Sequence, residues 1–121
     1  DVAHNAAAAR QLAATLGPST GSSIAVFAAL ADKNVTAMAR TLDACFDQWL
    51  VAELDGPRGV PAHRLAEQLR AVPVTGGVEA LESAAIAVRD AWHRCDPHGR
   101  IVVFGSFRTV AEAWPELEML G

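Results

Sequence analysis

The sequence of 121 residues has few cysteines, no block of like charges and no long apolar run. Its two cysteines, Cys45 and Cys95, lie far apart at a spacing that matches no metal site, whereas a secreted domain of this size tends to be rich in cysteine. The net charge is −4 without a basic stripe, so nucleic-acid binding is not expected. No apolar run reaches the roughly 18 residues that span a bilayer, and no signal peptide is visible. These absences predict a cytoplasmic protein with reduced cysteines and no membrane partner.

Two catalytic motifs are also missing from the chain. No G-x-x-x-x-G-K-[ST] phosphate-binding loop occurs, and no serine lies in the G-x-S-x-G context of an α/β hydrolase. A serine hydrolase of that class is therefore excluded. The sequence also has no internal repeat and no low-complexity linker.

The composition is that of one globular domain. Hydrophobic residues make up 51% of the chain and charged residues 20%, which provides one packed core and leaves too little polarity for disorder. The length suits a single domain over residues 1–121.

Short apolar runs alternate with stretches of helical periodicity. We expect buried strands at residues 24–30, 46–54 and 101–104, with a short edge strand at 72–74. We expect helices at residues 6–16, 35–42, 61–69, 78–93 and 109–119. The fourth helix rests on a stripe formed by Val78, Leu81, Ala85, Val88 and Trp92. The three tryptophans, at positions 49, 92 and 114, are expected to pack in the fold rather than to stack on a ligand.

This alternation predicts an α/β fold with a mostly parallel sheet flanked by helices. In such folds ligands bind where the strands end. Polar groups follow the expected strands at 32–33, 55–58 and 105–106. Residues 1–5 would form a fourth such group, but no strand precedes them. We therefore expect a fragment that lacks the first strand of its sheet.

Four ordered segments carry a resemblance to a known family. They are DVAHN at 1–5, FAALADKN at 27–34, LDGPRG at 54–59 and VFGSFRTVAEA at 103–113. Together they resemble the carboxy-terminal domain of the folylpolyglutamate synthase/dihydrofolate synthase family, within the Mur ligase superfamily. Ala6 replaces a proline that is usual in that pattern, and Ala28 stands where glycine is common. Neither departure removes a chemical group.

The resemblance implies a Rossmann-like domain of an ATP-dependent ligase. In that family a carboxylate of dihydropteroate or a folate is phosphorylated to an acyl phosphate, and the amino group of L-glutamate then attacks it. An amino-terminal domain supplies the phosphate loop, the magnesium ligands and much of the pterin pocket. The chain alone is therefore expected to be inactive, and the whole enzyme to be a monomer.

The resemblance also implies roles for residues near the start of the chain. Asp1 matches an aspartate that binds the ATP ribose, and His4 matches a catalytic histidine near the transferred phosphate. Asn5 matches a cofactor-binding position. Each has a structural alternative, because Asp1 could be a solvated first residue, His4 a helix-start histidine bonded to backbone, and Asn5 an N-cap.

Three further residues are candidates for binding glutamate. Gly105 and Ser106 lie between an expected strand and an expected helix, where free N–H groups suit a carboxylate. Arg58 lies in a Pro-Arg turn and could grip a carboxylate with two hydrogen bonds. The alternatives are an ordinary turn and cap for the Gly-Ser pair and a solvated surface arginine for Arg58.

Two other functions stay open at this point. The chain could belong to another Mur-type ligase that joins an amino acid to a cell-wall peptide, or it could be a non-catalytic α/β binding module. The FGSF stretch and the DGPRG loop favour the folate branch.

Overall fold

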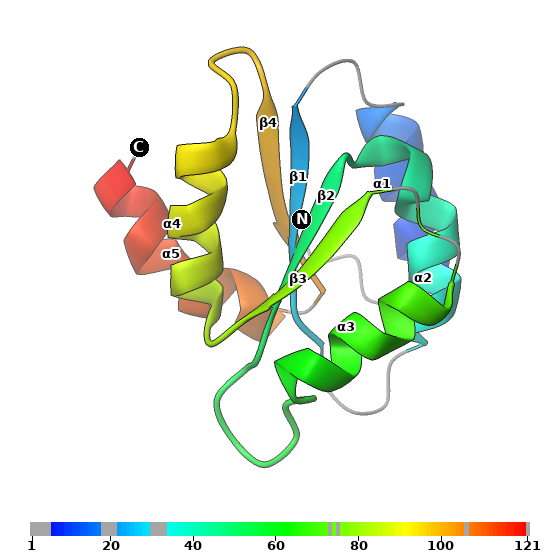
Figure 1. The fold of residues 1–121 in the computed structure, drawn as a ribbon, viewed down its shortest axis with the longest axis horizontal. Helices are drawn as coiled ribbons and strands as arrows, with labels where there is room; N and C mark the ends of the chain where they lie inside the picture. The colour runs from blue at the N-terminus through cyan, green and yellow to red at the C-terminus, as the bar shows by residue number, and fades with distance from the viewer. Residues whose placement is uncertain are drawn as a thin grey trace.

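In the part of the chain that the structure describes, four parallel strands and five α-helices form the domain (Figure 1). The structure is a computed structural model that describes residues 6–17, 22–29, 34–72, 74, 76–105 and 107–120. The strands are β1 (Ser23–Phe27), β2 (Gln48–Ala52), β3 (Gly77–Leu81) and β4 (Arg100–Phe104), in the spatial order β3-β2-β1-β4. The helices are α1 (Ala6–Leu16), α2 (Val35–Leu42), the short 3₁₀ helix η1 (Asp43–Cys45), α3 (Ala62–Ala71), α4 (Ala84–Arg94) and α5 (Phe107–Leu120). All strand pairings are parallel, so the predicted α/β fold class is confirmed.

Helices cover both faces of the sheet. Helices α1, α2 and α3 lie on one face, and α4 and α5 lie on the other (Figure 1). Side chains alternate along a strand, so Ala25 and Phe27 of β1 join the first core cluster and Ile24 and Val26 join the second. Because both faces are buried, β1 is apolar along most of its length, as parallel central strands usually are.

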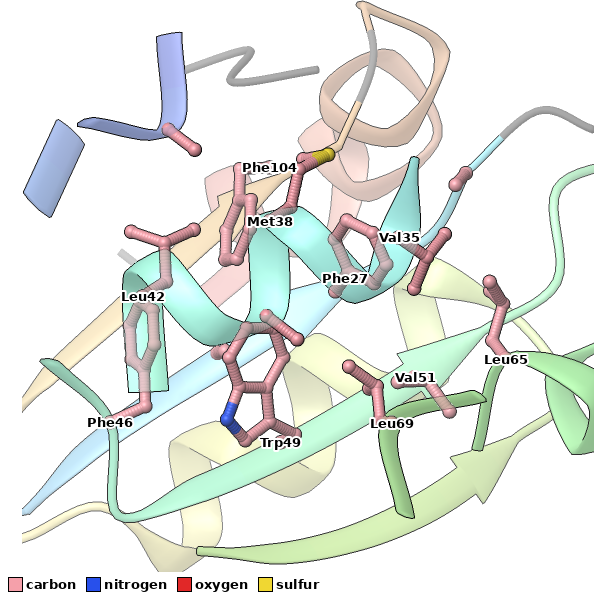
Figure 2. Close-up of a cluster of buried hydrophobic side chains, with 14 of the residues drawn as sticks. Phe27, Val35, Met38, Leu42, Phe46, Trp49, Val51, Leu65, Leu69 and Phe104 are labelled. Carbon is pink, nitrogen blue, oxygen red and sulfur yellow. The ribbon is translucent and has the colours of Figure 1, made fainter. Parts of the chain in front are cut away.

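Aromatic side chains fill the core between the sheet and α2. Phe27 and Phe104 lie on adjacent strands with ring centroids 5.2 Å apart, and Trp49 meets Phe104 edge to face at 5.8 Å. Met38 and Leu42 of α2 cover these rings (Figure 2). Offset and edge-to-face pairs of this kind add to the free energy gained by burial. This core fixes α2 against the sheet.

One arginine ties together the amino edge of the sheet. The guanidinium of Arg100 donates to the carbonyl oxygens of Leu16 (2.6 Å), Gly17 (3.1 Å) and Cys45 (2.9 Å). It also donates to the hydroxyl of Ser23 at 2.7 Å. Arg100 therefore joins the end of α1, the end of η1 and the starts of β1 and β4.

Most expected elements are present. Helices were expected at 6–16 and 35–42, and α1 and α2 occupy these residues. The strand expected at 24–30 ends earlier, at Phe27, and the one expected at 46–54 is shorter, because β2 spans Gln48–Ala52. The last helix is longer than expected and continues through Pro115.

The helix expected at 78–93 is wrong in its first part. Gly77–Leu81 is the edge strand β3, which pairs in parallel with β2. Helix α4 begins only at Ala84, where the hydroxyl of Ser83 accepts a hydrogen bond from the Ile86 amide at 3.2 Å. The edge strand expected at 72–74 is also wrong, since Val72 is the C-cap of α3. Apolar residues from the short edge strand β3 onward lie at spacings of three and four residues that match those of a helix, and this explains the wrong helix prediction.

The three tryptophans, which were expected to pack rather than to stack on a ligand, differ in how deeply they are buried. Trp49 is buried, but Trp92 is 48% exposed and Trp114 is 55% exposed. Both lie on the outer helices α4 and α5, which have solvent on one side. The expected burial of β4 also holds only in part, since Ile101 is half-buried on this edge strand. Of the helices the structure describes, none is long and apolar enough to cross a membrane.

Candidate functional site at the carboxyl edge of the sheet

Three loops meet where the strands end. The Val60 amide donates to the Ala29 carbonyl oxygen at 3.1 Å, which joins the loop after β2 to the end of β1. The Thr109 hydroxyl donates to the Ala28 carbonyl oxygen at 2.9 Å, which joins α5 to the same place. These contacts form one continuous rim from β2 through β1 to β4.

Gly105 follows β4 and packs directly against the end of β1. Its φ is +124°, a conformation that side-chain-bearing residues rarely adopt. A Cβ atom on Gly105 would collide with the carbonyl oxygen of Ala28 and would lie 3.2 Å from Cδ1 of Phe27. Only glycine therefore fits. The structure places this predicted site residue at the expected edge and gives it a packing role there.

Arg58 lies at the same edge, in the turn after β2. Its side chain is exposed. The turn is closed by the Gly59 amide, which donates to the Gly56 carbonyl oxygen at 3.3 Å, and a Cβ atom on Gly59 would collide with the carbonyl oxygen of Leu54. Arg58 is thus held on a tight turn with its side chain toward solvent, an arrangement that suits a ligand carboxylate and a solvated arginine equally.

Four of the predicted site residues, Asp1, His4, Asn5 and Ser106, lie outside the described residues. The Asp32-Lys33 pair does as well. Their proximity to one another and to Gly105 stays a prediction.

The topological reason for that prediction holds in the structure. Helix α5 begins directly after β4 and Gly105, at the carboxyl edge. Helix α1 ends at Leu16, which Arg100 binds at the amino edge, so α1 begins at the carboxyl edge as well (Figure 1). The two helices start at one edge on opposite faces of the sheet.

Sequence reasoning missed three side chains that build this rim. Besides Thr109, Glu53 accepts a hydrogen bond from the Ala62 amide at 3.2 Å and so caps the start of α3. Glu112 of α5 accepts one from the Asp55 amide at 3.4 Å. These contacts join residues 9 to 81 positions apart, so no local pattern reveals them. The one available signal was Thr109 itself, a polar residue near the start of the last helix.

The described groups of the rim are suited to binding anions. In the described part of the chain, no group of three histidine, cysteine, aspartate or glutamate side chains is placed to hold a metal ion. A hollow of about 580 Å³ near the ends of β2 and β3 is lined by several residues, among them Glu53, His63 and Glu82. Backbone N–H groups at helix starts and an exposed arginine favour anions.

Cys45 is not part of this rim. It lies at the amino edge, 3% exposed, and burial raises the pKa of its thiol, which the nearby charge of Arg100 lowers in part. A buried thiol that ionises less readily is a poor nucleophile. Cys45 belongs instead to the hydrophobic core.

Comparison with known proteins indicates the same family as the four sequence segments. Residues 1–107 match the family model described as Mur ligase, glutamate ligase domain. The dihydrofolate synthase/folylpolyglutamate synthase of Escherichia coli K12 is 35% identical over 113 residues, which are 92% of this chain and 25% of that protein. The chain thus spans about a quarter of the length of this curated relative.

Solved structures show the same likeness. The E. coli FolC structure in complex with DHPP and ADP has a TM-score of 0.86 at 33% identity, over 98% of this chain and 28% of that one. A bifunctional folylpolyglutamate synthase/dihydrofolate synthase with Mn, AMPPNP and L-glutamate bound has a TM-score of 0.85 at 35% identity, with the same coverage. From the match over residues 1–107 and the shared fold, the chain belongs to the family of Mur ligase glutamate ligase domains.

Proposed function

We propose that this chain is the carboxy-terminal domain of an ATP-dependent ligase that joins L-glutamate to dihydropteroate or to a folate through an amide bond. The observation that carries the proposal is the fit of 98% of the chain, at a TM-score of 0.85, to a synthase structure that holds Mn, AMPPNP and L-glutamate. The FGSF and DGPRG segments, which favour this branch of the family, flank the rim described above.

The chemistry proceeds in two steps that balance without a redox partner. A carboxylate oxygen of the acceptor takes the terminal phosphoryl group of ATP and ADP leaves, which gives an acyl phosphate. The amine of glutamate then attacks the acyl carbon, loses a proton and expels phosphate. The first step prepares a better leaving group than hydroxide, so amide formation no longer has to expel water.

The roles proposed for residues of this chain rest on the resemblance of its four segments to the family. Gly105 and Ser106 offer backbone N–H groups, and Arg58 offers a guanidinium, to the carboxylates of glutamate. Asp1 binds the ATP ribose, Asn5 assists in nucleotide binding, and His4 stabilises charge that develops near the transferred phosphate. In this proposal the rim holds and orients the amino acid for attack.

The remaining parts of the active site belong, in this proposal, to an amino-terminal domain of the same protein. The chain has no phosphate-binding loop, and the described residues hold no cluster suited to a metal ion. That domain would bind the phosphates of ATP and the magnesium ion. The whole enzyme would be a cytoplasmic monomer, which fits the free thiols of Cys45 and Cys95.

Steady-state release of ADP tests the function. The full-length protein is expected to release ADP only when dihydropteroate or a folate and L-glutamate are both present, whereas the 121-residue chain alone releases none. Omitting glutamate, and replacing it with aspartate, provide the controls. Turnover by the chain alone would show that it holds a complete active site and would reject the division between domains.

The two alternatives give different results in the same assay. A cell-wall ligase would release ADP with a cell-wall peptide precursor and not with dihydropteroate. A binding module would bind nucleotide in a titration and give no turnover with either acceptor. Either outcome would replace the proposal.

A further inference from the structure

Thr109 is a polar side chain in a fully buried position. Its relative exposure is 0%, and its hydroxyl donates to the carbonyl oxygen of Ala28 at 2.9 Å. The two residues are 81 positions apart in the chain. The hydrogen bond therefore joins the first turn of α5 to the residue that follows β1.

Threonines elsewhere in the helices use their hydroxyls differently. Thr15 bonds to the Gln11 carbonyl oxygen and Thr41 bonds to the Ala37 carbonyl oxygen, both at 3.0 Å and both four residues back in the same helix. Such bonds connect nothing beyond one turn of helix. Thr109 instead binds a different element, so its hydroxyl fixes the position of α5 relative to β1.

The Ala28 carbonyl oxygen, which accepts this hydrogen bond, also restricts which residue type fits in the turn before α5. The Ala28 carbonyl oxygen is the atom that a Cβ on Gly105 would meet first. Gly105, which precedes α5, and Thr109, in the first turn of α5, thus both meet the same atom at the end of β1. Any shift of α5 along the sheet therefore also moves Gly105.

We propose that Thr109 is a positioning residue for glutamate, and this inference rests on the proposed function. Through its bond to Ala28 it holds Gly105, just before α5, where the backbone N–H group of that residue meets a glutamate carboxylate. Without the hydroxyl the turn is free to shift, and hydrogen bonds weaken steeply when their geometry is disturbed. Glutamate affinity is then lost while the ATP site, which in this proposal lies mainly on another domain, is retained.

The test compares Thr109→Val, which keeps the shape and removes the hydroxyl, with Thr109→Ser, which keeps the hydroxyl. Kinetics of the full-length ligase are measured with glutamate varied and then with ATP varied. Thr109→Val is expected to raise KM for glutamate about three- to tenfold, the range of one lost hydrogen bond. The KM for ATP stays within about twofold, and Thr109→Ser restores the wild-type KM for glutamate.

Thr41→Val is the matched control. It removes a hydroxyl–carbonyl bond of similar length within α2, and it is expected to change Tm without changing KM for glutamate. If Thr109→Val does not fold, the pair Thr109→Ser and Thr109→Ala, which differ only by the hydroxyl oxygen, replaces it in the comparison.

Each outcome decides between roles. A KM for glutamate that is unchanged in the hydroxyl-free variant, or raised equally in Thr109→Ser, overturns the positioning role and leaves Thr109 a packing residue. An equal rise in KM for glutamate and for ATP overturns it as well, because the damage is then general. A wild-type protein without glutamate-dependent turnover overturns this inference together with the proposed function, whereas the earlier outcomes leave that function standing.

Discussion

At the amino edge of the sheet one charged side chain joins four segments. At the carboxyl edge the loops are joined instead by several separate contacts, among them those of Thr109 and Glu112, and by the close packing of Gly105. Arg100 makes its four hydrogen bonds to uncharged oxygens. Gly105 and Thr109 both meet the Ala28 carbonyl oxygen. The proposed function assigns stability to the amino edge and binding to the carboxyl edge.

Placing a side chain at the carboxyl edge should have the largest effect. Gly105→Ala adds a Cβ that collides with the Ala28 carbonyl oxygen at a backbone conformation of φ +124°. Strain and overpacking together are expected to lower the free energy of unfolding by roughly 2–5 kcal/mol. Urea denaturation of the chain measures it. Gly77→Ala is the control, since a Cβ there meets nothing within 4 Å; equal stability of the two variants would contradict the close packing at Gly105.

Breaking the clamp at the amino edge should come next. Arg100→Met removes four hydrogen bonds from a charged donor, with an expected loss of about 2–4 kcal/mol. In the full-length enzyme, kcat and KM should not change at temperatures where the variant stays folded.

Arg94→Met provides the comparison for that variant. Arg94 pairs with Glu79 at 2.8 Å on the surface, and loss of such a pair costs under about 1 kcal/mol. If the folded Arg100→Met enzyme showed a changed KM for glutamate, the proposal that the two edges have separate roles would be wrong.

Removing the predicted ligand contacts should affect kinetics and leave stability nearly intact. In the full-length enzyme, Ser106→Ala is expected to weaken glutamate use by roughly 0.5–1.5 kcal/mol, or up to about 3 kcal/mol if the hydrogen bond is charge-assisted. His4→Ala should act on turnover instead, because an imidazole there stabilises developing charge. Steady-state kinetics with glutamate varied measure both. Folded variants that match wild type would make the two residues structural caps.

The smallest effect concerns pH at the amino edge. Burial raises the pKa of the Cys45 thiol, with Arg100 opposing, so the unfolded chain releases this proton at a lower pH than the folded chain does. The stability that comes from this raised pKa is present below the ordinary thiol pKa of about 8.5 and is lost as the pH rises above it. Urea denaturation between about pH 7 and 10 should show a fall that Cys45→Ala reduces. An identical slope in both proteins would contradict it.

Local patterns were enough to predict elements whose burial follows their own sequence. Helix α1 is predicted by its alanines, and the strand β1 by an apolar run buried on both faces. Strand β3 was missed because it is an edge strand in which only two of five residues are partly buried, so Val78 and Leu81 read as part of the helical stripe. Ser83, a good N-cap, was the overlooked signal for the start of α4.

The candidate site likewise has residues that the sequence predicts and contacts that it does not. Gly105 and Arg58 were found because residues of the right type follow strands in a familiar order. The contacts that hold them, from Thr109 and Glu112 of α5 to Ala28 and Asp55, join distant parts of the chain. They depend on how α5 packs across the sheet, which no spacing in the sequence expresses.

The parallel arrangement of the strands aligns the dipoles of the helices. Helices α2, α3, α4 and α5 each follow the end of a strand, and α1 begins at the same edge, so five helix macrodipoles are aligned. Each contributes roughly half a positive charge at its start. Basic residues gather in the last turns at the opposite ends: Arg40, Arg70, His93 and Arg94. In a protein of net charge −4, the helix starts therefore add partial positive charge to a rim that also carries the carboxylates of Glu53, Asp55 and Glu112. The effect of this partial charge on anions extends over about a Debye length, roughly 8–10 Å at physiological ionic strength, and weakens as salt is added.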